Sequence, residues 1–266
     1  MSVSIIRALS VCLAVAAGSL QPEENVRTIG PRFHFETSYD AKGLKGKEIS
    51  TGTEVPLYKT YPGARKIALP PPAVGTLSFE EAVAKRRSVR QFETKAITLE
   101  QIARLLHSAN GITQNRGGTS HRGVPSAGAL YPIELYLVAN SVTGLDSGIY
   151  HFQVRNTSLE EIKKGDFSER LRQAALGQEA LDNAPAAVVI TARFDRTTHK
   201  YADRGYRYVY MEAGEVCQTL YLQATTLGLG TVAIGAFLDD EVNRVLDLNG
   251  SSEAGLLIMP IGYPRE

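Results

Sequence analysis

YRYVYMEAGEVCQTLYLQATTLGLGTVAIGAF, the stretch from Tyr206 to Phe237, decides how this 266-residue chain can fold. Its first part, from about Tyr206 to Leu227, is apolar on most sides of a helical wheel, which predicts a long central helix. We expect Gly228 and Gly230 to end that helix, and TVAIGAF, residues 231–237, to form a strand. A dinucleotide-binding fingerprint needs the opposite order, with the glycines after a strand and before a helix, so we do not predict one here.

Shorter elements of both types flank this stretch. SFEEAVAKRRS, residues 78–88, and TLEQIARLLHSANG, residues 98–111, each begin with a hydroxyl residue followed three positions later by Glu or Gln, the capping box that starts a helix. A further helix is predicted over DDEVNRVLDL, residues 239–248. Strands are predicted over IELYLVA (133–139), GIYHFQV (148–154), APAAVVITARF (184–194) and GLLIMPIGY (255–263). This mixture predicts an α+β domain with a sheet covered by helices.

Composition excludes several classes of function. The chain has 29 basic and 28 acidic residues, so its net charge of +1 gives no field that would hold a nucleic acid or an anionic membrane, and we expect neither as a partner. Cys12 and Cys217 lack CxxC spacing and the five histidines are scattered, so we expect no disulfide framework and no metal site. A hydrophobic fraction of 43% is sufficient for a large core.

The N-terminal third has a different character. Residues 1–20 contain a short apolar run, Ala8 to Ala17, which reads either as a packing helix or as a weak export signal and is too short to span a bilayer. We favour the packing helix and a cytoplasmic protein, with export as the alternative. We therefore divide the chain into an N-terminal extension (1–30), an extended arm rich in Gly, Pro and Thr (31–76) and a folded domain (77–266).

RRSVRQF, Arg86 to Phe92, concentrates positive charge in a nearly neutral chain. If this segment is extended, Arg86, Ser88 and Arg90 share one side, while Arg87 and Val89 face the other. Two guanidinium forks and a hydroxyl suit a phosphate group, which carries about −1.5 to −2 charge and three acceptor oxygens. The alternative interpretation is a solvated basic helix end that complements the helix dipole.

PSAG, Pro125 to Gly128, precedes an apolar strand and consists of small residues. Such residues allow backbone N–H groups to approach a flat ligand closely, and main-chain donors suit the polar edge of an aromatic ring system. An ordinary turn is the alternative.

Four segments together resemble the FMN-dependent nitroreductase superfamily, and within it the SagB/ThcOx-type, azoline-oxidase-like dehydrogenases. They are RRSVRQF, PSAGALYP, KYADRGYRYVYMEAG with the following LGLGTVAIGAF, and IGYP. The arm motifs TSYDAKG and YKTYPGA are similar to this branch too, and the resemblance covers nearly all of residues 33–266. It implies a nitroreductase-like α+β fold with a mostly antiparallel sheet, in an intertwined homodimer that binds one FMN per subunit at the interface.

The resemblance also implies roles for individual residues. Arg86, Ser88 and Arg90 would hold the phosphate and ribityl end of FMN, with Arg87 nearby and a weaker contact from Arg265. The partner subunit would bring its PSAG segment to the flavin. The isoalloxazine ring would pack against Ile234, Gly235 and Ala236.

Lys200 and Tyr201 match the Lys-Tyr pair that azoline oxidases use beside the flavin. Oxidation of an azoline ring removes a proton from carbon while hydride leaves for the flavin, so a base near the ring is required. The resemblance therefore implies that these two residues are catalytic; the alternative is a surface HKY sequence before a helix.

Three functions follow. The first is an FMN-dependent dehydrogenase of an azoline-like or related C–N substrate, a small molecule or peptide-derived. The second is an NAD(P)H-dependent nitro- or quinone reductase. The third is a noncatalytic flavin-binding subunit of a modification complex, because Glu215 and Thr219 replace the usual histidine and asparagine after EAG.

Overall fold

The structure, a computed structural model, describes residues 29–39, 55–73, 75 and 77–265. The chain divides into two units, residues 1–38 and 39–266. In the first unit the described element is α1 (Ile29–Glu36), in which Arg32 and Glu36 form an ion pair of 3.0 Å. The sequence predicts an extended arm from residue 31; the pairing of opposite charges one turn apart favours a helix instead. Residues 1–28 of the predicted N-terminal extension, with Cys12, lie outside the described residues.

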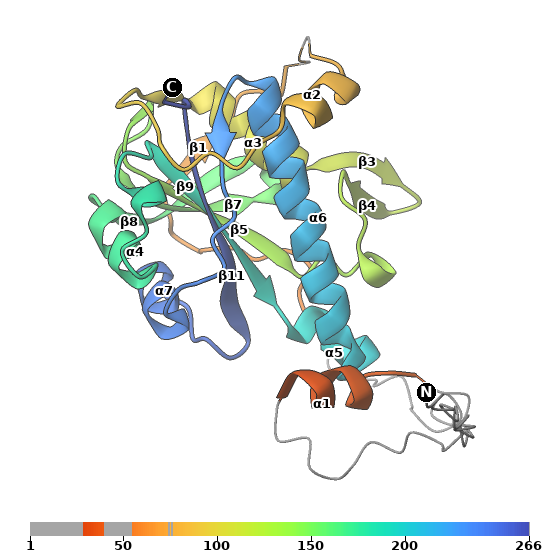
Figure 1. The fold of residues 1–266 in the computed structure, drawn as a ribbon. Coiled ribbons are helices and arrows are strands. Elements are labelled where there is room, and N and C mark those ends of the chain that lie inside the picture. Colours follow the sequence, from red (N-terminus) through yellow and green to blue (C-terminus); the bar gives the residue numbers. More distant parts are fainter. Residues whose placement is uncertain (1–28, 40–54, 74, 76, 266) are drawn as a thin grey trace, which may run out of the picture. The chain divides into compact units, whose positions relative to one another are not determined.

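A seven-stranded sheet forms the centre of the second unit (Figure 1). Its strand order is β1-β8-β7-β5-β9-β11-β10, and every neighbouring pair is antiparallel. The prediction of an α+β fold with a mostly antiparallel sheet is confirmed. The strands are β1 (Lys66–Ala68), β5 (Ile133–Ala139), β7 (Gly148–Gln153), β8 (Ser158–Lys164), β9 (Ala186–Arg193), β10 (Gly230–Thr231) and β11 (Glu253–Gly262).

The two helices that follow β1 start as predicted. In α2 (Phe79–Lys85) and α3 (Leu99–Asn110), the capping boxes at Ser78 and Thr98 are both formed. The long central helix is α6 (Arg204–Thr226), and it ends before Gly228, whose φ of +68° is the left-handed conformation that favours glycine. The other helices are α4 (Ser168–Ala174), α5 (Asp195–Tyr201) and α7 (Asp239–Leu246), with single 3-10 turns at Ala127–Ala129, Val154–Asn156 and Glu179–Leu181.

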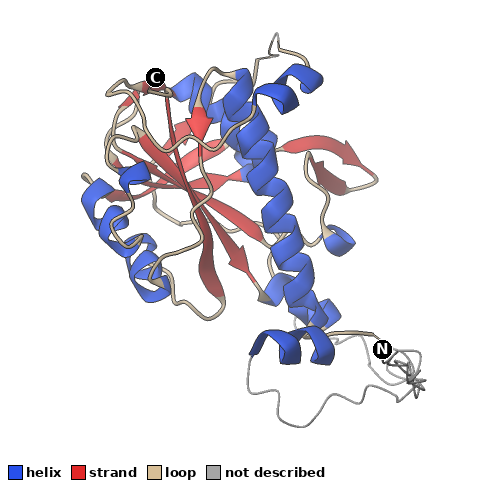
Figure 2. Cartoon of the chain, viewed as in Figure 1, coloured by secondary structure: helices blue, strands red, loops and turns tan. Residues whose placement is uncertain are grey.

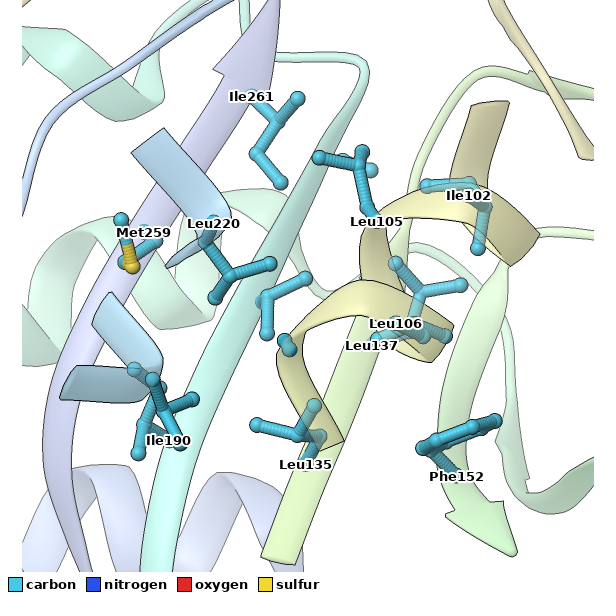
Figure 3. Packing of buried hydrophobic residues seen from close by; sticks show 14 of the residues in the cluster. Ile102, Leu105, Leu106, Leu135, Leu137, Phe152, Ile190, Leu220, Met259 and Ile261 are labelled. Carbon is cyan, nitrogen blue, oxygen red and sulfur yellow. The ribbon is translucent and has the colours of Figure 1, made fainter. Parts of the chain in front are cut away.

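Different helices cover the two faces of the sheet (Figure 2). On one face, Leu105 and Leu106 of α3 and Leu220 of α6 pack against Leu135 and Leu137 of β5 (Figure 3). On the other face, α4 and α7 cover the neighbouring side chains of β5 and β9. Complete burial of each leucine contributes about 2 kcal/mol, so this packing fixes α6 firmly on the sheet. None of the described helices is long and apolar enough to cross a membrane.

Four features differ from the prediction. The strand predicted over 231–237 is regular only at Gly230–Thr231, because the Ala233 N–H donates to the Tyr221 hydroxyl (2.8 Å) rather than to a neighbouring strand. Part of the predicted arm, β1, pairs with β8 and so belongs to the sheet. A polar hairpin of β3 (Ile112–Arg116) and β4 (Thr119–Arg122) was not predicted, nor was the short parallel pair of β2 (Ile97–Thr98) and β6 (Val142–Thr143).

A buried ionic cluster crosses one end of the sheet. We use this name for Glu134 of β5, His151 of β7, Glu160 of β8 and Arg196 of α5. Glu134 contacts Arg196 Nη2 at 2.6 Å and His151 Nε2 at 2.8 Å, and His151 Nδ1 lies 3.2 Å from Glu160. Burial acts to raise the pKa of Glu134, but Arg196 and His151 outweigh it and lower the pKa to about 2. Burial acts to lower the pKa of His151, but its hydrogen bonds to the two glutamates outweigh it and raise that pKa.

We expect this cluster to make the protein acid-sensitive. The pKa of Glu134 falls from 4.5 to about 2 on folding, so its stabilisation is complete above pH 4.5 and is lost as the pH falls toward 2. That shift corresponds to about 3 kcal/mol. Urea unfolding at pH 6, 5, 4 and 3 measures the loss. In Glu134→Gln, which has no ionisable group there, the free energy of unfolding should fall less steeply over the same range.

Parallel slopes for the wild type and Glu134→Gln would contradict this assignment. His151 has the opposite sign: its raised pKa stabilises the fold below about pH 6.5, and this contribution is lost as the pH rises through the folded pKa.

Candidate functional site

The RRSVRQF segment leaves the end of α2 and crosses to β10. The Val89 N–H donates to the Thr231 carbonyl (2.9 Å), and the Val89 side chain packs directly on Gly230. A Cβ atom at Gly230 would lie 2.6 Å from that side chain. Gly230 therefore serves close packing, and the prediction that it ends the long helix is wrong because Gly228 already does so.

Tyr221 of α6 joins two parts of the predicted site. Its hydroxyl lies 3.2 Å from Ser88 Oγ and accepts the Ala233 N–H at 2.8 Å, while the Arg86 guanidinium lies 5.2 Å from its ring centroid. Arg86 and Ser88 thus lie on the same side of their segment, as the predicted alternation requires. The sequence predicts no role for Tyr221, since an aromatic residue on the apolar side of a helix has the same signal as a core residue.

The arginines of this segment have different partners. Arg87 donates to the carbonyls of Ala84 (3.0 Å) and Arg86 (2.7 Å), so it caps the end of α2. Within the described part of the chain, neither Arg86 nor Arg90 forms an ion pair with a carboxylate. Two guanidinium groups with no protein anion beside them suit an anionic ligand.

Arg265 lies against this segment, and the predicted stretch 234–236 directly follows Ala233, whose N–H donates to the Tyr221 hydroxyl. The Arg265 N–H donates to the Gln91 carbonyl (3.0 Å), which brings the end of the chain beside Arg90. Ile234 exchanges backbone hydrogen bonds with Ile258 (2.8 and 3.0 Å), and the next two residues, Gly235 and Ala236, are exposed. We call the whole group the arginine half-site; it consists of Arg86, Ser88, Arg90, Tyr221, Ile234, Gly235, Ala236 and Arg265.

The remaining predicted residues form a second group, which consists of Pro125, Ser126, Ala127, Gly128, Lys200 and Tyr201. Together with Glu212, which the sequence did not predict, we call this group the lysine half-site. PSAG forms a tight turn in which Gly128 has a φ of +65°. A Cβ atom there would lie 2.8 Å from the Tyr201 hydroxyl and 3.0 Å from Lys200 Nζ. PSAG and the Lys200–Tyr201 pair are therefore in contact within one chain, which the sequence did not indicate.

Glu212 lies under this turn. Together with Ser126, Tyr208, Met211 and neighbouring residues it lines a pocket of about 250 Å³. The Glu212 side chain is buried, and burial raises its pKa to about 7 against the lowering effects of Ser126 and Arg122. The carboxyl group therefore changes charge near neutral pH. In the sequence, nothing distinguishes Glu212 from the other polar residues of the long helix.

The two half-sites lie at different places along α6. Tyr221 belongs to the first and Glu212 to the second, and nine residues of helix correspond to about 13 Å. One chain thus brings Arg86 and Ser88 together at Tyr221, with Arg265 against the same segment, and separately brings PSAG, Lys200 and Tyr201 together. It does not unite all of them around one pocket.

We expect Gly128→Ala to be destabilising for two reasons. Its positive φ is unfavourable for a side chain, and the new methyl group would contact Tyr201 and Lys200. Gly117→Ala is the matched control, because Gly117 has a φ of +58° and no atom within 4 Å of the place that a methyl group would occupy. Both variants should lose about 1–2 kcal/mol from backbone strain. Thermal unfolding should show a larger decrease in Tm for Gly128→Ala than for Gly117→Ala. Equal decreases would mean that the contact of the new methyl group with Tyr201 and Lys200 does not affect stability.

Comparisons with known proteins identify relatives over most of the folded unit. A sequence profile of the nitroreductase family matches residues 83–263. A Methanocaldococcus jannaschii protein described as a nitroreductase is 41% identical over 195 residues, 73% of this chain and 96% of the relative. The microcin B17-processing protein McbC of Escherichia coli is 28% identical over 171 residues, 62% of each chain. A crystal structure of a nitroreductase-like protein from Anabaena variabilis superposes with a TM-score of 0.67 and 29% identity, covering 88% of this chain and 47% of the other.

Proposed function

This chain belongs to the nitroreductase family and is an oxidoreductase, and from that premise we propose that it uses FMN to oxidise an azoline-like or related C–N substrate, as SagB/ThcOx-type dehydrogenases do. The observation that carries the proposal is the arginine half-site. Its Arg86 guanidinium and Ser88 hydroxyl lie beside Tyr221, and neither Arg86 nor Arg90 forms an ion pair with a carboxylate of the described residues. The similarity to McbC, a processing protein, supports the azoline branch.

The residues of the arginine half-site fit FMN. Arg86 and Arg90 provide donor forks for a phosphate, and the Ser88 hydroxyl, already near Tyr221, adds a further donor. The Thr231 hydroxyl beside them is buried and has no hydrogen-bond partner among the described residues. Ile234, Gly235 and Ala236 offer a small, partly exposed surface that a flat ring can approach.

We propose that the lysine half-site of one subunit serves the flavin held by the arginine half-site of another. The separation of the two half-sites along α6 supports this arrangement. So does the apolar surface on the outer side of α6, where Tyr210 is 50% and Met211 is 63% exposed, and on α2, where Phe79 is 67% exposed. Large apolar side chains exposed on adjoining helices are typical of a protein interface. The proposed assembly is a homodimer.

Lys200 and Tyr201 then take part in proton transfer. Bound FMN supplies a two-electron acceptor for the hydride that leaves the substrate carbon. The substrate also loses a proton, and the Lys200 amine, adjacent to the Tyr201 hydroxyl across Gly128, is positioned to accept it. The azoline thereby loses one hydride and one proton and becomes the aromatic azole.

An NAD(P)H-dependent nitro- or quinone reductase is the second candidate. It is favoured by the 41% identity to the archaeal relative described as a nitroreductase. In that reaction hydride comes from the nicotinamide, and no proton has to be removed from a substrate carbon, so the Lys200–Tyr201 pair would have no catalytic part in flavin reduction.

One series of spectra tests the proposal. The purified protein should absorb between about 350 and 500 nm, where oxidised flavin has two bands. Anaerobic mixing with a thiazoline-containing peptide should bleach these bands, whereas NADPH should bleach them slowly. Rapid bleaching by NADPH and none by the thiazoline would favour the reductase. A colourless protein that cannot be reconstituted with FMN would overturn both.

A further inference from the structure

The turn that contains PSAG is strained. Between Pro125 and Tyr131, three residues have positive φ: Gly128 (+65°), Ala129 (+55°) and Tyr131 (+45°). Positive φ in residues other than glycine costs of order 1–3 kcal/mol each, and such conformations persist only where the surrounding structure fixes them. The question is therefore which contacts hold this turn.

Tyr131 is fixed at each of its polar groups. Its N–H donates to Ser126 Oγ (2.8 Å), its carbonyl accepts from Arg196 Nη1 (2.9 Å), and its hydroxyl accepts from the Arg122 N–H (3.2 Å). The Arg122 guanidinium also lies 4.4 Å from the Tyr131 ring centroid. The residue is only 4% exposed, so water does not compete for these bonds.

Arg196 connects three separate parts of the fold through one guanidinium group. Nη1 donates to the Tyr131 carbonyl in the turn, Nε donates to the Pro56 carbonyl (2.9 Å), and Nη2 pairs with Glu134 of the sheet (2.6 Å). The side chain is 1% exposed. Because Arg196 lies on α5, one helical turn before Lys200, the helix that carries the Lys200–Tyr201 pair is tied directly to the turn that carries PSAG.

We propose that Arg196 is a positioning residue that holds the turn Pro125–Tyr131 and the Lys200–Tyr201 pair in one fixed arrangement. The proposal rests on the function proposed above for that pair. Arginine suits this position because its planar fork donates in two fixed directions, to Tyr131 and Pro56, while its charge pairs with Glu134, whereas lysine keeps the charge but not the geometry. Arg196→Lys therefore keeps a cation for Glu134 and loses the directed bonds to Tyr131 and Pro56.

Two measurements test the proposal, and one of them does not depend on flavin. Hydrogen exchange should be at least 10-fold faster at the amides of residues 126–131 in Arg196→Lys than in the wild type, after correction for global stability. In the flavin-loaded protein, the rate of flavin reduction by a thiazoline peptide should fall 10- to 100-fold, while the dissociation constant of the peptide changes less than 3-fold.

Lys59→Met is the matched control. Lys59 forms a buried ion pair with Glu253 (2.6 Å) on the same face of the sheet. Its hydrogen bonds go to Glu253 and Tyr136, and neither residue belongs to the turn or to α5. This variant should lower Tm without changing exchange in 126–131 or the reduction rate. If Arg196→Lys does not fold, Glu134→Asp, which draws the carboxylate away from the guanidinium, should give the same two effects at smaller size.

The proposal would be overturned if amide exchange in residues 126–131 were as slow in Arg196→Lys as in the wild type. It would also be overturned if Arg196→Lys slowed flavin reduction no more than Lys59→Met does. Absence of flavin from the wild type would instead refute the proposed function, and the exchange measurement would still decide whether Arg196 holds the turn.

Discussion

Arg86→Ala/Arg90→Ala is expected to purify without colour and to bind FMN about 10²- to 10⁴-fold more weakly than the wild type. Each guanidinium contributes charge-assisted hydrogen bonds to a phosphate, worth about 1.5–3 kcal/mol each, and a 10-fold change in affinity corresponds to about 1.4 kcal/mol. Neither arginine has a carboxylate partner in the described structure, so their removal leaves no unpaired protein charge behind. Titration of the apoprotein with FMN, followed by flavin fluorescence, measures the loss.

Arg87→Ala is the control for this variant. It removes one positive charge from the same segment, against two in the double variant, and its guanidinium donates to carbonyls at the end of α2. We expect a small loss of helix stability and less than a 10-fold change in FMN affinity. Thermal unfolding of the three apoproteins should show that the double variant remains folded. Equal weakening by Arg87→Ala would mean that total charge matters and that the arrangement of Arg86 and Arg90 does not.

Lys200→Ala should retain FMN and lose turnover. A positioned general base contributes about 10²- to 10⁴-fold to the rate, and removal of the amine should slow flavin reduction by a thiazoline peptide by that factor. Anaerobic stopped-flow absorbance measures the rate directly. The visible spectrum before mixing confirms that the flavin is still bound.

Two controls make this result specific. Reduction by NADPH should be almost unchanged in Lys200→Ala, because hydride transfer from nicotinamide removes no proton from a substrate carbon. Tyr201→Phe removes the hydroxyl but preserves the ring, whose centroid lies 5.0 Å from that of Tyr208, so it separates proton transfer from packing. An unchanged thiazoline rate in Lys200→Ala would assign proton transfer to another group.

Local signals in the sequence predicted most of the fold. The capping boxes at Ser78 and Thr98 lie at the starts of their own helices, and the short apolar segments of β5 and β9 are typical of buried strands, so no distant contact was needed to find them. The β3–β4 hairpin was missed because its strands are polar on both faces. Its one signal was the pair Gly117–Gly118, whose φ values of +58° and +80° form the turn.

The candidate site was less predictable, because its missed members act through residues distant in sequence. Tyr221 matters because α6 places it between Ser88 and Ala233, and Arg196 matters because Tyr131 and Pro56 converge on it. Glu212 has a raised pKa only because the fold buries it under PSAG. Each of these properties belongs to the tertiary structure, and a pattern along the chain does not contain it.

The placement of Tyr221 and Glu212 on one helix has a consequence for a two-subunit enzyme. If each flavin lies between the arginine half-site of one subunit and the lysine half-site of the other, every α6 contacts both cofactors, one near Tyr221 and the other near Glu212. A shift of α6 when the first FMN binds would also move residues that contact the second FMN, so the two binding steps would be linked. Occupancy by FMN should then rise cooperatively or anticooperatively, and the binding isotherm would deviate from that of two independent sites.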